Sequence, residues 1–117
     1  MARITAYLTA SLLIITTVIS FLEMPFPALQ NYLSLNPSLI LKQPWMIFTS
    51  LFVHANIGHL IQNMVALLIF GAFLENIIGF KKTISVYFTA GIAGGAASIF
   101  FYPHSLSLGA SGAIMGL

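Results

Sequence analysis

The sequence of 117 residues has no cysteine and no aspartate, and only six of its side chains carry a formal charge. Without cysteine the chain can form neither a disulfide framework nor a thiolate metal site. Its charged fraction is 5%, far below the roughly 25% of soluble domains, whereas 59% of its residues are hydrophobic. These scarcities exclude a soluble domain and predict an integral membrane protein with several transmembrane helices.

Three apolar stretches are long enough to cross the hydrocarbon core as helices, which takes about 20 residues. They are predicted over residues 5–22, 57–78 and 83–102. A fourth helix is expected over residues 110–117, where it can rise only about 10 Å and cannot cross. The predicted fold class is an all-α polytopic membrane protein, a single domain over residues 1–117. It would hold three full transmembrane helices and the start of a fourth, either because the natural chain continues or because the sequence is a fragment.

The first stretch has a second interpretation as a cleaved signal peptide. Arg3 would be its charged flank, and residues 12–19 its apolar core. Against this interpretation, no small-x-small cleavage site follows the stretch, and residues 5–22 are long for a signal core. We therefore retain a transmembrane helix as the expectation.

The few basic residues predict the orientation of the chain. Arg3 precedes the first stretch, and Lys81 and Lys82 lie between the second and the third. Because lysine and arginine concentrate on the cytoplasmic side, the amino terminus is predicted to be cytoplasmic and the loop over residues 23–56 to face outward. The four basic residues are too scattered to neutralise a phosphate backbone, so nucleic acid is not expected as a partner. The expected surroundings are a lipid bilayer, and the oligomeric state is not predicted.

The outer loop over residues 23–56 is long and shows no obvious regular structure, which is typical of functional loops. Its apolar residues and Trp45 favour a position at the membrane interface. The alternative is a passive tether between two helices.

Polar side chains cluster at the outer end of the second stretch, where they are costly and indicate a function. The cluster includes His54, His59 and Asn63, and the last two are four residues apart and share a helical face. One alternative is that they hydrogen-bond neighbouring helices as structural glue. Another alternative is a metal site. The three histidines, His54, His59 and His104, lack a carboxylate partner and a sequence spacing that would fix the geometry of metal ligands. We expect no metal and no other cofactor.

A second cluster, Gly109-Ala110-Ser111-Gly112, opens the last helix on the same side of the membrane. A serine at a helix start has an exposed hydroxyl beside unsatisfied backbone N–H groups that can stabilise an anion. The alternative is an ordinary serine N-cap. The Gly-x-Ser-x-Gly elbow of soluble hydrolases is not met, because position 113 is alanine.

Pairs of small residues four apart permit these helices to pack closely. The pairs are Gly91 with Gly95, Ala93 with Ala97, and Gly112 with Gly116.

The absence of aspartate narrows the chemistry that these clusters can perform. It excludes an aspartyl protease and a Ser-His-Asp triad, and no His-Glu-x-x-His zinc motif is present. Glu75 cannot replace the aspartate, because it lies about 24 Å further along the helix than His59. A serine with a histidine base remains.

These residues resemble the rhomboid family of intramembrane serine proteases. The resemblance covers essentially the whole chain and corresponds to the amino-terminal half of a six-helix core. It is carried by Trp45, Thr49, Phe52, His54, His59, Asn63, Glu75, Gly79 and the run Gly109-Ala110-Ser111-Gly112.

The resemblance implies a role for each residue of the two clusters. Ser111 would be the nucleophile, and His59, Asn63 and the Ser111 backbone N–H would stabilise the oxyanion. His54, Gly109 and Gly112 would line the active site. The outer loop would be a membrane-embedded element beside the substrate entry, and the substrates would be transmembrane proteins cut near the outer end of a helix.

Two features depart from the family pattern. Met46 follows Trp45 where the family usually has arginine, and the family's base histidine lies on a last core helix that this chain does not reach. The sequence therefore predicts a rhomboid-type serine endopeptidase whose 117 residues alone are inactive. The alternatives are a non-catalytic rhomboid-like protein that binds transmembrane helices, and a packing subunit without a ligand.

Overall fold

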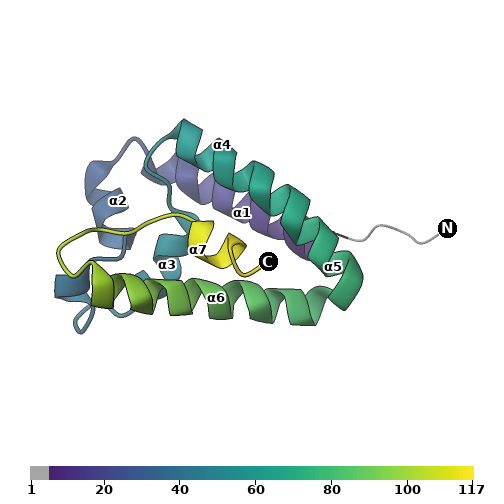
Figure 1. Cartoon of the computed structure of the whole chain (residues 1–117). Helices are drawn as coiled ribbons and strands as arrows, with labels where there is room; N and C mark the ends of the chain where they lie inside the picture. The colour runs from purple at the N-terminus through teal and green to yellow at the C-terminus, as the bar shows by residue number, and fades with distance from the viewer. Residues whose placement is uncertain (1–5) are drawn as a thin grey trace.

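A computed structural model describes residues 6–117, and within them every regular element is a helix (Figure 1). The predicted all-α class is therefore confirmed. An isolated antiparallel bridge joins Leu35 to Ser107. Arg3, which supported the predicted orientation, lies outside the described residues.

Two helices are long and apolar enough to cross a membrane, Ile57–Ile78 and Phe80–Phe101. The first helix, α1, covers Tyr7–Glu23 and has 17 residues, which is the lower limit of the usual range for a crossing. A third crossing by α1 therefore stays a prediction.

The helix over Ile57–Ile78 has three parts, which are α4 (Ile57–Ala66), a π-helical turn η3 (Leu67–Gly71) and α5 (Ala72–Ile78). Asn56 caps its start, since its side-chain oxygen accepts a 2.9 Å hydrogen bond from the backbone N–H of His59. Gly79 ends it with a φ of 86°, a left-handed conformation that glycine adopts without strain.

The next helix, α6, covers Phe80–Phe101 and therefore begins before the predicted residue 83. The prediction was wrong because it placed Lys81 and Lys82 in a connecting loop. In the structure Gly79 alone turns the chain, and both lysines lie exposed in the first turn of α6. A membrane helix tolerates them there, because long basic side chains reach the interface from helix ends.

The segment between α1 and α4 is largely helical, contrary to the expectation of an irregular loop. Prolines begin two of its helices, at positions where a missing N–H group is harmless. The Thr49 hydroxyl donates a 2.8 Å hydrogen bond to the Leu33 carbonyl and ties two of these helices together. The elements are α2 (Pro27–Leu33), η1 (Pro37–Leu39), α3 (Met46–Thr49) and η2 (Ser50–Phe52).

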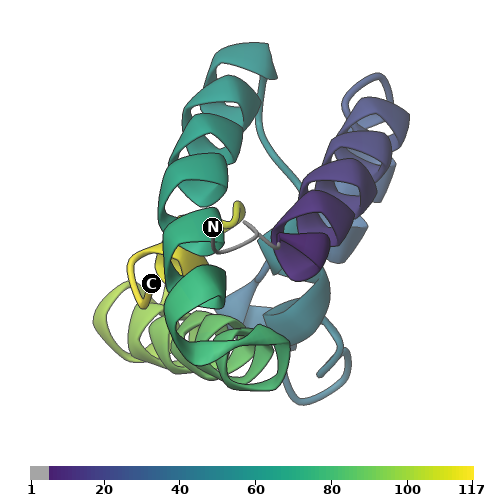
Figure 2. The ribbon, with the colours of Figure 1, turned by 90° about the vertical axis from the view of Figure 1, so that its right-hand side faces the viewer.

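A buried carboxylate joins the start of α1 to the end of the second helix. The Glu75 oxygens accept hydrogen bonds of 2.8 and 2.9 Å from the backbone N–H groups of Leu8 and Thr9, and a third bond from the Thr9 hydroxyl. Glu75 thereby caps α1, whose first turn has no capping side chain of its own. Gly71 packs against Thr9 so closely that a Cβ there would lie 2.9 Å from the Thr9 hydroxyl. The two helices lie side by side and run in opposite directions (Figures 1 and 2).

The last helix, α7 (Ser111–Ile114), lies between α6 and α4 (Figure 1). Small residues permit its approach to α6, because a Cβ at Gly116 would overlap the Cβ of Ala90. Gly91 instead leaves room for Leu51 of η2, and Gly95 leaves room for Ile47 of α3. The predicted pair Ala93 and Ala97 is exposed.

Candidate active site

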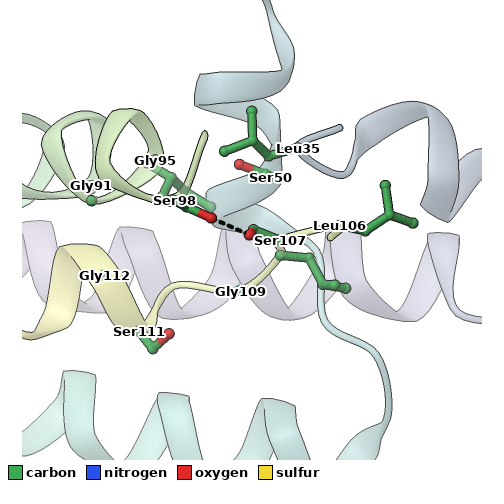
Figure 3. A pocket seen from close by; sticks show the side chains of 13 residues that line it. Leu35, Ser50, Gly91, Gly95, Ser98, Leu106, Ser107, Gly109, Ser111 and Gly112 are labelled. Atoms are coloured by element: carbon green, nitrogen blue, oxygen red, sulfur yellow. Dashed lines mark hydrogen bonds between the residues drawn. The ribbon is translucent and has the colours of Figure 1, made fainter. Parts of the chain in front are cut away.

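Ser111 is the first residue of α7, and Ala110 occupies the N-cap position. The Ser111 side chain is exposed, and its hydroxyl forms no hydrogen bond with any residue in the described part of the chain. The alternative of an ordinary serine N-cap is therefore wrong. In Figure 3 Ser111 lies apart from the hydrogen-bonded pair Ser98 and Ser107.

Ser111 lies between two cavities. One, of about 350 Å³, is bounded by the small residues of α6 and by the loop that precedes Ser111 (Figure 3). Gly109 and Gly112 line this cavity. The other, of about 360 Å³, is lined by both Ser111 and Asn63. Asn63 of the first predicted cluster and Ser111 of the second thus line one cavity.

Asn63 is buried, with 7% of its surface exposed. Its side-chain nitrogen Nδ2 has no hydrogen-bond partner among residues 6–117. An amide that served as glue between helices would donate to a neighbouring helix, and Asn63 does not. A buried donor without a partner is costly, and such a group is expected to have an explanation in function or in bound solvent.

Gly109 brings the backbone before Ser111 against the two side chains of α4. Its φ of 107° requires glycine, and its N–H donates a 2.8 Å hydrogen bond to the Ser50 carbonyl. A Cβ at this position would lie 2.7 Å from Cε1 of His59, 2.9 Å from Nε2 of His59 and 3.4 Å from Nδ2 of Asn63. His59 and Asn63 therefore converge on the peptide that leads to Ser111.

The orientation of His59 follows from the cap of α4. Its ring nitrogen Nδ1 lies 3.5 Å from the Ala55 backbone nitrogen, on the side of the preceding loop. The other nitrogen, Nε2, faces Gly109. With Nδ1 as an acceptor, Nε2 carries the proton and can donate a hydrogen bond toward residues 102–110, the loop that leads to Ser111 and is called the serine loop below.

His54 is fully buried and lies behind the serine loop. Its Nε2 accepts a 3.2 Å hydrogen bond from the Ala110 backbone N–H. Its Nδ1 lies 3.1 Å from the Ser20 hydroxyl, which donates to the Phe52 carbonyl. This network assigns the ring proton to Nδ1. Burial and, as a smaller effect, the neighbouring His59 imidazole lower the pKa of His54 to about 4.

The implied position of His54 in the lining of the active site stays a prediction. His54 borders neither of the two cavities beside Ser111, because both of its ring nitrogens are turned to partners behind the serine loop. Two residues that contact its backbone, Glu23 and Gln30, were not predicted as site residues. The available signal was that Glu23 is one of only two acidic residues.

The described residues hold no group of three histidine or acidic side chains that could bind a metal ion. His104 is exposed on the loop after α6.

The fold and the site together define an all-helical integral membrane protein in which a serine lies near two potential side-chain donors. Residues 41–117 match the family model of the rhomboid domain. The chain therefore belongs to the rhomboid family.

Curated relatives include both proteases and an inactive protein. The chain is 40% identical over 76 residues to RHOMBOID-like protein 6, mitochondrial, of Arabidopsis thaliana, covering 65% of the chain and 25% of the relative. It is 41% identical over 75 residues to Rhomboid-like protease 3 of Toxoplasma gondii, covering 64% and 28%. It is 33% identical over 92 residues to Inactive rhomboid protein 1 of Drosophila melanogaster, covering 76% and 6%. The chain spans about a quarter of the length of the first two relatives.

Proposed function

We propose that this chain supplies the nucleophile and the oxyanion-binding groups of a serine-type endopeptidase that cleaves proteins within the membrane. The observation that carries the proposal is the amide of Asn63, which is buried, has no partner among residues 6–117 and lines the same cavity as Ser111. A buried donor without a partner, at a cavity that the serine also lines, is suited to a charge that develops only during the reaction.

In this proposal Ser111 Oγ attacks the carbonyl carbon of the scissile peptide bond. The electron pair of the carbonyl moves to its oxygen, which becomes the oxyanion of the tetrahedral intermediate. Nε2 of His59, Nδ2 of Asn63 and the backbone N–H of Ser111 donate hydrogen bonds to that oxygen. Removal of one such donor typically lowers kcat about 10²- to 10³-fold.

The family resemblance assigns the base that accepts the serine proton to a histidine on a last core helix, and no histidine of these 117 residues takes its place. His54 is unsuited to this task, because Ala110 and Ser20 engage both of its ring nitrogens. His59 would have to give up its role as a donor. Without a base a serine hydroxyl is a weak nucleophile, so the 117 residues alone are expected to be inactive.

The substrates proposed are transmembrane proteins, cut near the outer end of a helix that unwinds into the site. Hydrogen bonds between the segments support this proposal, because the residue before Ser111 bonds to His54, just ahead of α4, and His54 bonds to Glu23 at the end of α1. With the amino terminus in the cytoplasm, these segments face the outer side of the membrane. The segment over residues 24–56 would then lie beside the entry for substrates.

A non-catalytic role in binding transmembrane helices is the second candidate, because the chain is similar to an inactive rhomboid protein. One experiment separates the two. The complete protein that contains these residues is reconstituted with a model single-span substrate, and cleavage and binding are measured for the native form and for Ser111→Ala. Ser105→Ala, on the exposed loop before α7, is the matched control.

The protease proposal predicts that Ser111→Ala abolishes cleavage and leaves substrate binding intact, while Ser105→Ala cleaves normally. Cleavage that persists in Ser111→Ala would overturn the serine mechanism. Binding without cleavage by the native protein would favour the non-catalytic role.

A further inference from the structure

A second buried carboxylate lies at the end of α1. Glu23 has no exposed surface, and its two oxygens accept separate hydrogen bonds. Oε1 accepts a 3.0 Å bond from the backbone N–H of His54, and Oε2 accepts a 2.9 Å bond from Nε2 of Gln30. The same Gln30 nitrogen donates a 3.0 Å bond to the His54 carbonyl. Two side chains from two helices thus hold both backbone polar groups of one residue.

The burial of Glu23 is unfavourable by itself. No ion pair to Glu23 forms among residues 6–117, and a buried carboxylate in an apolar surrounding is costly unless hydrogen bonds compensate. Both of its oxygens are directed to the backbone of His54 or to the glutamine that also contacts that backbone. The buried Glu23 carboxylate, although costly, therefore serves to hold the backbone of one residue, His54.

His54 transmits this placement to the serine loop. Its backbone is fixed by Glu23 and Gln30, and its ring accepts the hydrogen bond from the Ala110 N–H at 3.2 Å. This N–H belongs to the peptide between Gly109 and Ala110, so the imidazole holds the peptide group that comes one residue before Ser111. A continuous path of hydrogen bonds, each between 2.9 and 3.2 Å, leads from the end of α1 to the residue before the serine.

We infer that Glu23 and Gln30 are positioning residues, which set the orientation of Ser111 through the backbone and ring of His54. This inference rests on the proposed function only where catalysis is the readout. A displacement of about 1 Å in a catalytic group can lower a rate about 100-fold, so loss of either side chain is expected to affect turnover more than substrate binding.

The test compares two identical substitutions in the complete protein. In Glu23→Gln an amide NH₂ group replaces one carboxylate oxygen and faces the donor of either Gln30 or His54. We expect kcat to fall about tenfold or more while KM changes less than about twofold. Glu75→Gln is the matched control, because Glu75 is also buried and also accepts backbone hydrogen bonds, but at the far end of α1. It is expected to lower Tm and leave kcat per folded molecule unchanged.

A spectroscopic readout makes the test independent of cleavage. The ¹⁵N signals of the His54 ring, assigned by their absence in His54→Gln, should report a proton on Nδ1 in the native protein. In Glu23→Gln they should shift toward a mixture of the two tautomers, because the ring loses its fixed relation to Ala110. Gln30→Met, at a half-buried position, should shift them in the same direction and serves if Glu23→Gln does not fold.

Native ¹⁵N signals and native kcat in a folded Glu23→Gln or Gln30→Met variant would overturn the inference, whatever the change in Tm. Failure of the proposed function appears differently. The native protein would then cleave nothing, or Ser111→Ala would still cleave, while the ring signals in Glu23→Gln would still shift.

Discussion

The backbone N–H of Ala110 donates a hydrogen bond to Nε2 of His54, a residue 56 positions earlier in the chain. Because this ring is buried and its other nitrogen faces Ser20, His54 acts as a fixed acceptor and not as a proton carrier. The two histidines ahead of and within α4 therefore have different tasks. His54 supports the serine loop from behind, and His59 faces it.

The neutral state of His54 gives the protein a pH dependence. His54 precedes the helix Ile57–Ile78, and its pKa in the folded protein is about 4 against 6.5 for an ordinary histidine. The unfolded chain therefore binds the proton first, and stability is expected to fall as the pH drops from about 6.5 to about 4. Thermal unfolding measured across this range should show the fall. His54→Gln should be less stable at neutral pH and should lack this part of the pH dependence; an unchanged slope would contradict the assignment.

Asn63→Ala is expected to separate activity from stability. The Asn63 amide has no partner among residues 6–117, so its removal should leave the free energy of unfolding within about 1 kcal/mol of the native value. Cleavage should fall about 10²- to 10³-fold, because the donor proposed for the oxyanion is lost. Asn56→Ala is the comparison, since it removes the cap of α4 and should cost about 1 kcal/mol of stability. A stability loss in Asn63→Ala larger than that of Asn56→Ala would identify Asn63 as a structural residue.

Gly109→Ala should damage both the fold and the site. Its φ of 107° is strained for alanine, and the added Cβ would lie 2.7 Å from the His59 ring. We expect a loss of about 1–3 kcal/mol of stability and a lower rate of labelling of Ser111 by a fluorophosphonate. Gly112→Ala, where a Cβ would meet no atom within 4 Å, should retain native stability. Equal Tm values for the two variants would show that the close approach to His59 is not present in solution.

Gly91 and Gly94 are neighbours on α6 and should respond oppositely to alanine. A Cβ at Gly91 would lie 2.7 Å from Leu51, whereas a Cβ at Gly94 would lie 3.7 Å from Gly112, an ordinary contact. Gly91→Ala should therefore cost about 1–3 kcal/mol through overpacking. Gly94→Ala should be neutral or stabilising by up to about 1 kcal/mol, because alanine favours helix. Thermal unfolding of both variants checks this difference, which would fail if Gly94→Ala were the less stable.

The helices were predictable from the sequence where local signals dominate. Apolar stretches bounded by glycine or proline located the helices that begin at Tyr7 and Ile57 within two residues of the prediction. The predicted start of α6, residue 83, lies after the observed start at Phe80, because the prediction assigned the charged Lys81 and Lys82 to a loop. The short helices before α4 were missed because prolines were interpreted only as helix ends, whereas Pro27 and Pro37 begin helices.

The site was predictable in the part that depends on spacing along one helix. His59 and Asn63 are four residues apart, and that spacing places them on one face wherever the helix packs. The support of His54 was not predictable, because Ser20, Glu23 and Gln30 approach it only through the tertiary fold. No spacing rule connects residues from a helix end and a surface segment to a ring 24 to 34 positions away.

The π-helical turn over Leu67–Gly71 determines which residues of the second helix can work together. In an uninterrupted α-helix, Asn63 and Glu75 would point about 120° apart, so that one of them would face away from the bundle. A π turn absorbs roughly one additional residue and removes about 100° of that rotation. Both side chains are buried in the structure. The π-helical turn thus lets one helix direct an amide to the cavity of Ser111 near its first residues and a carboxylate to the start of α1 near its last residues.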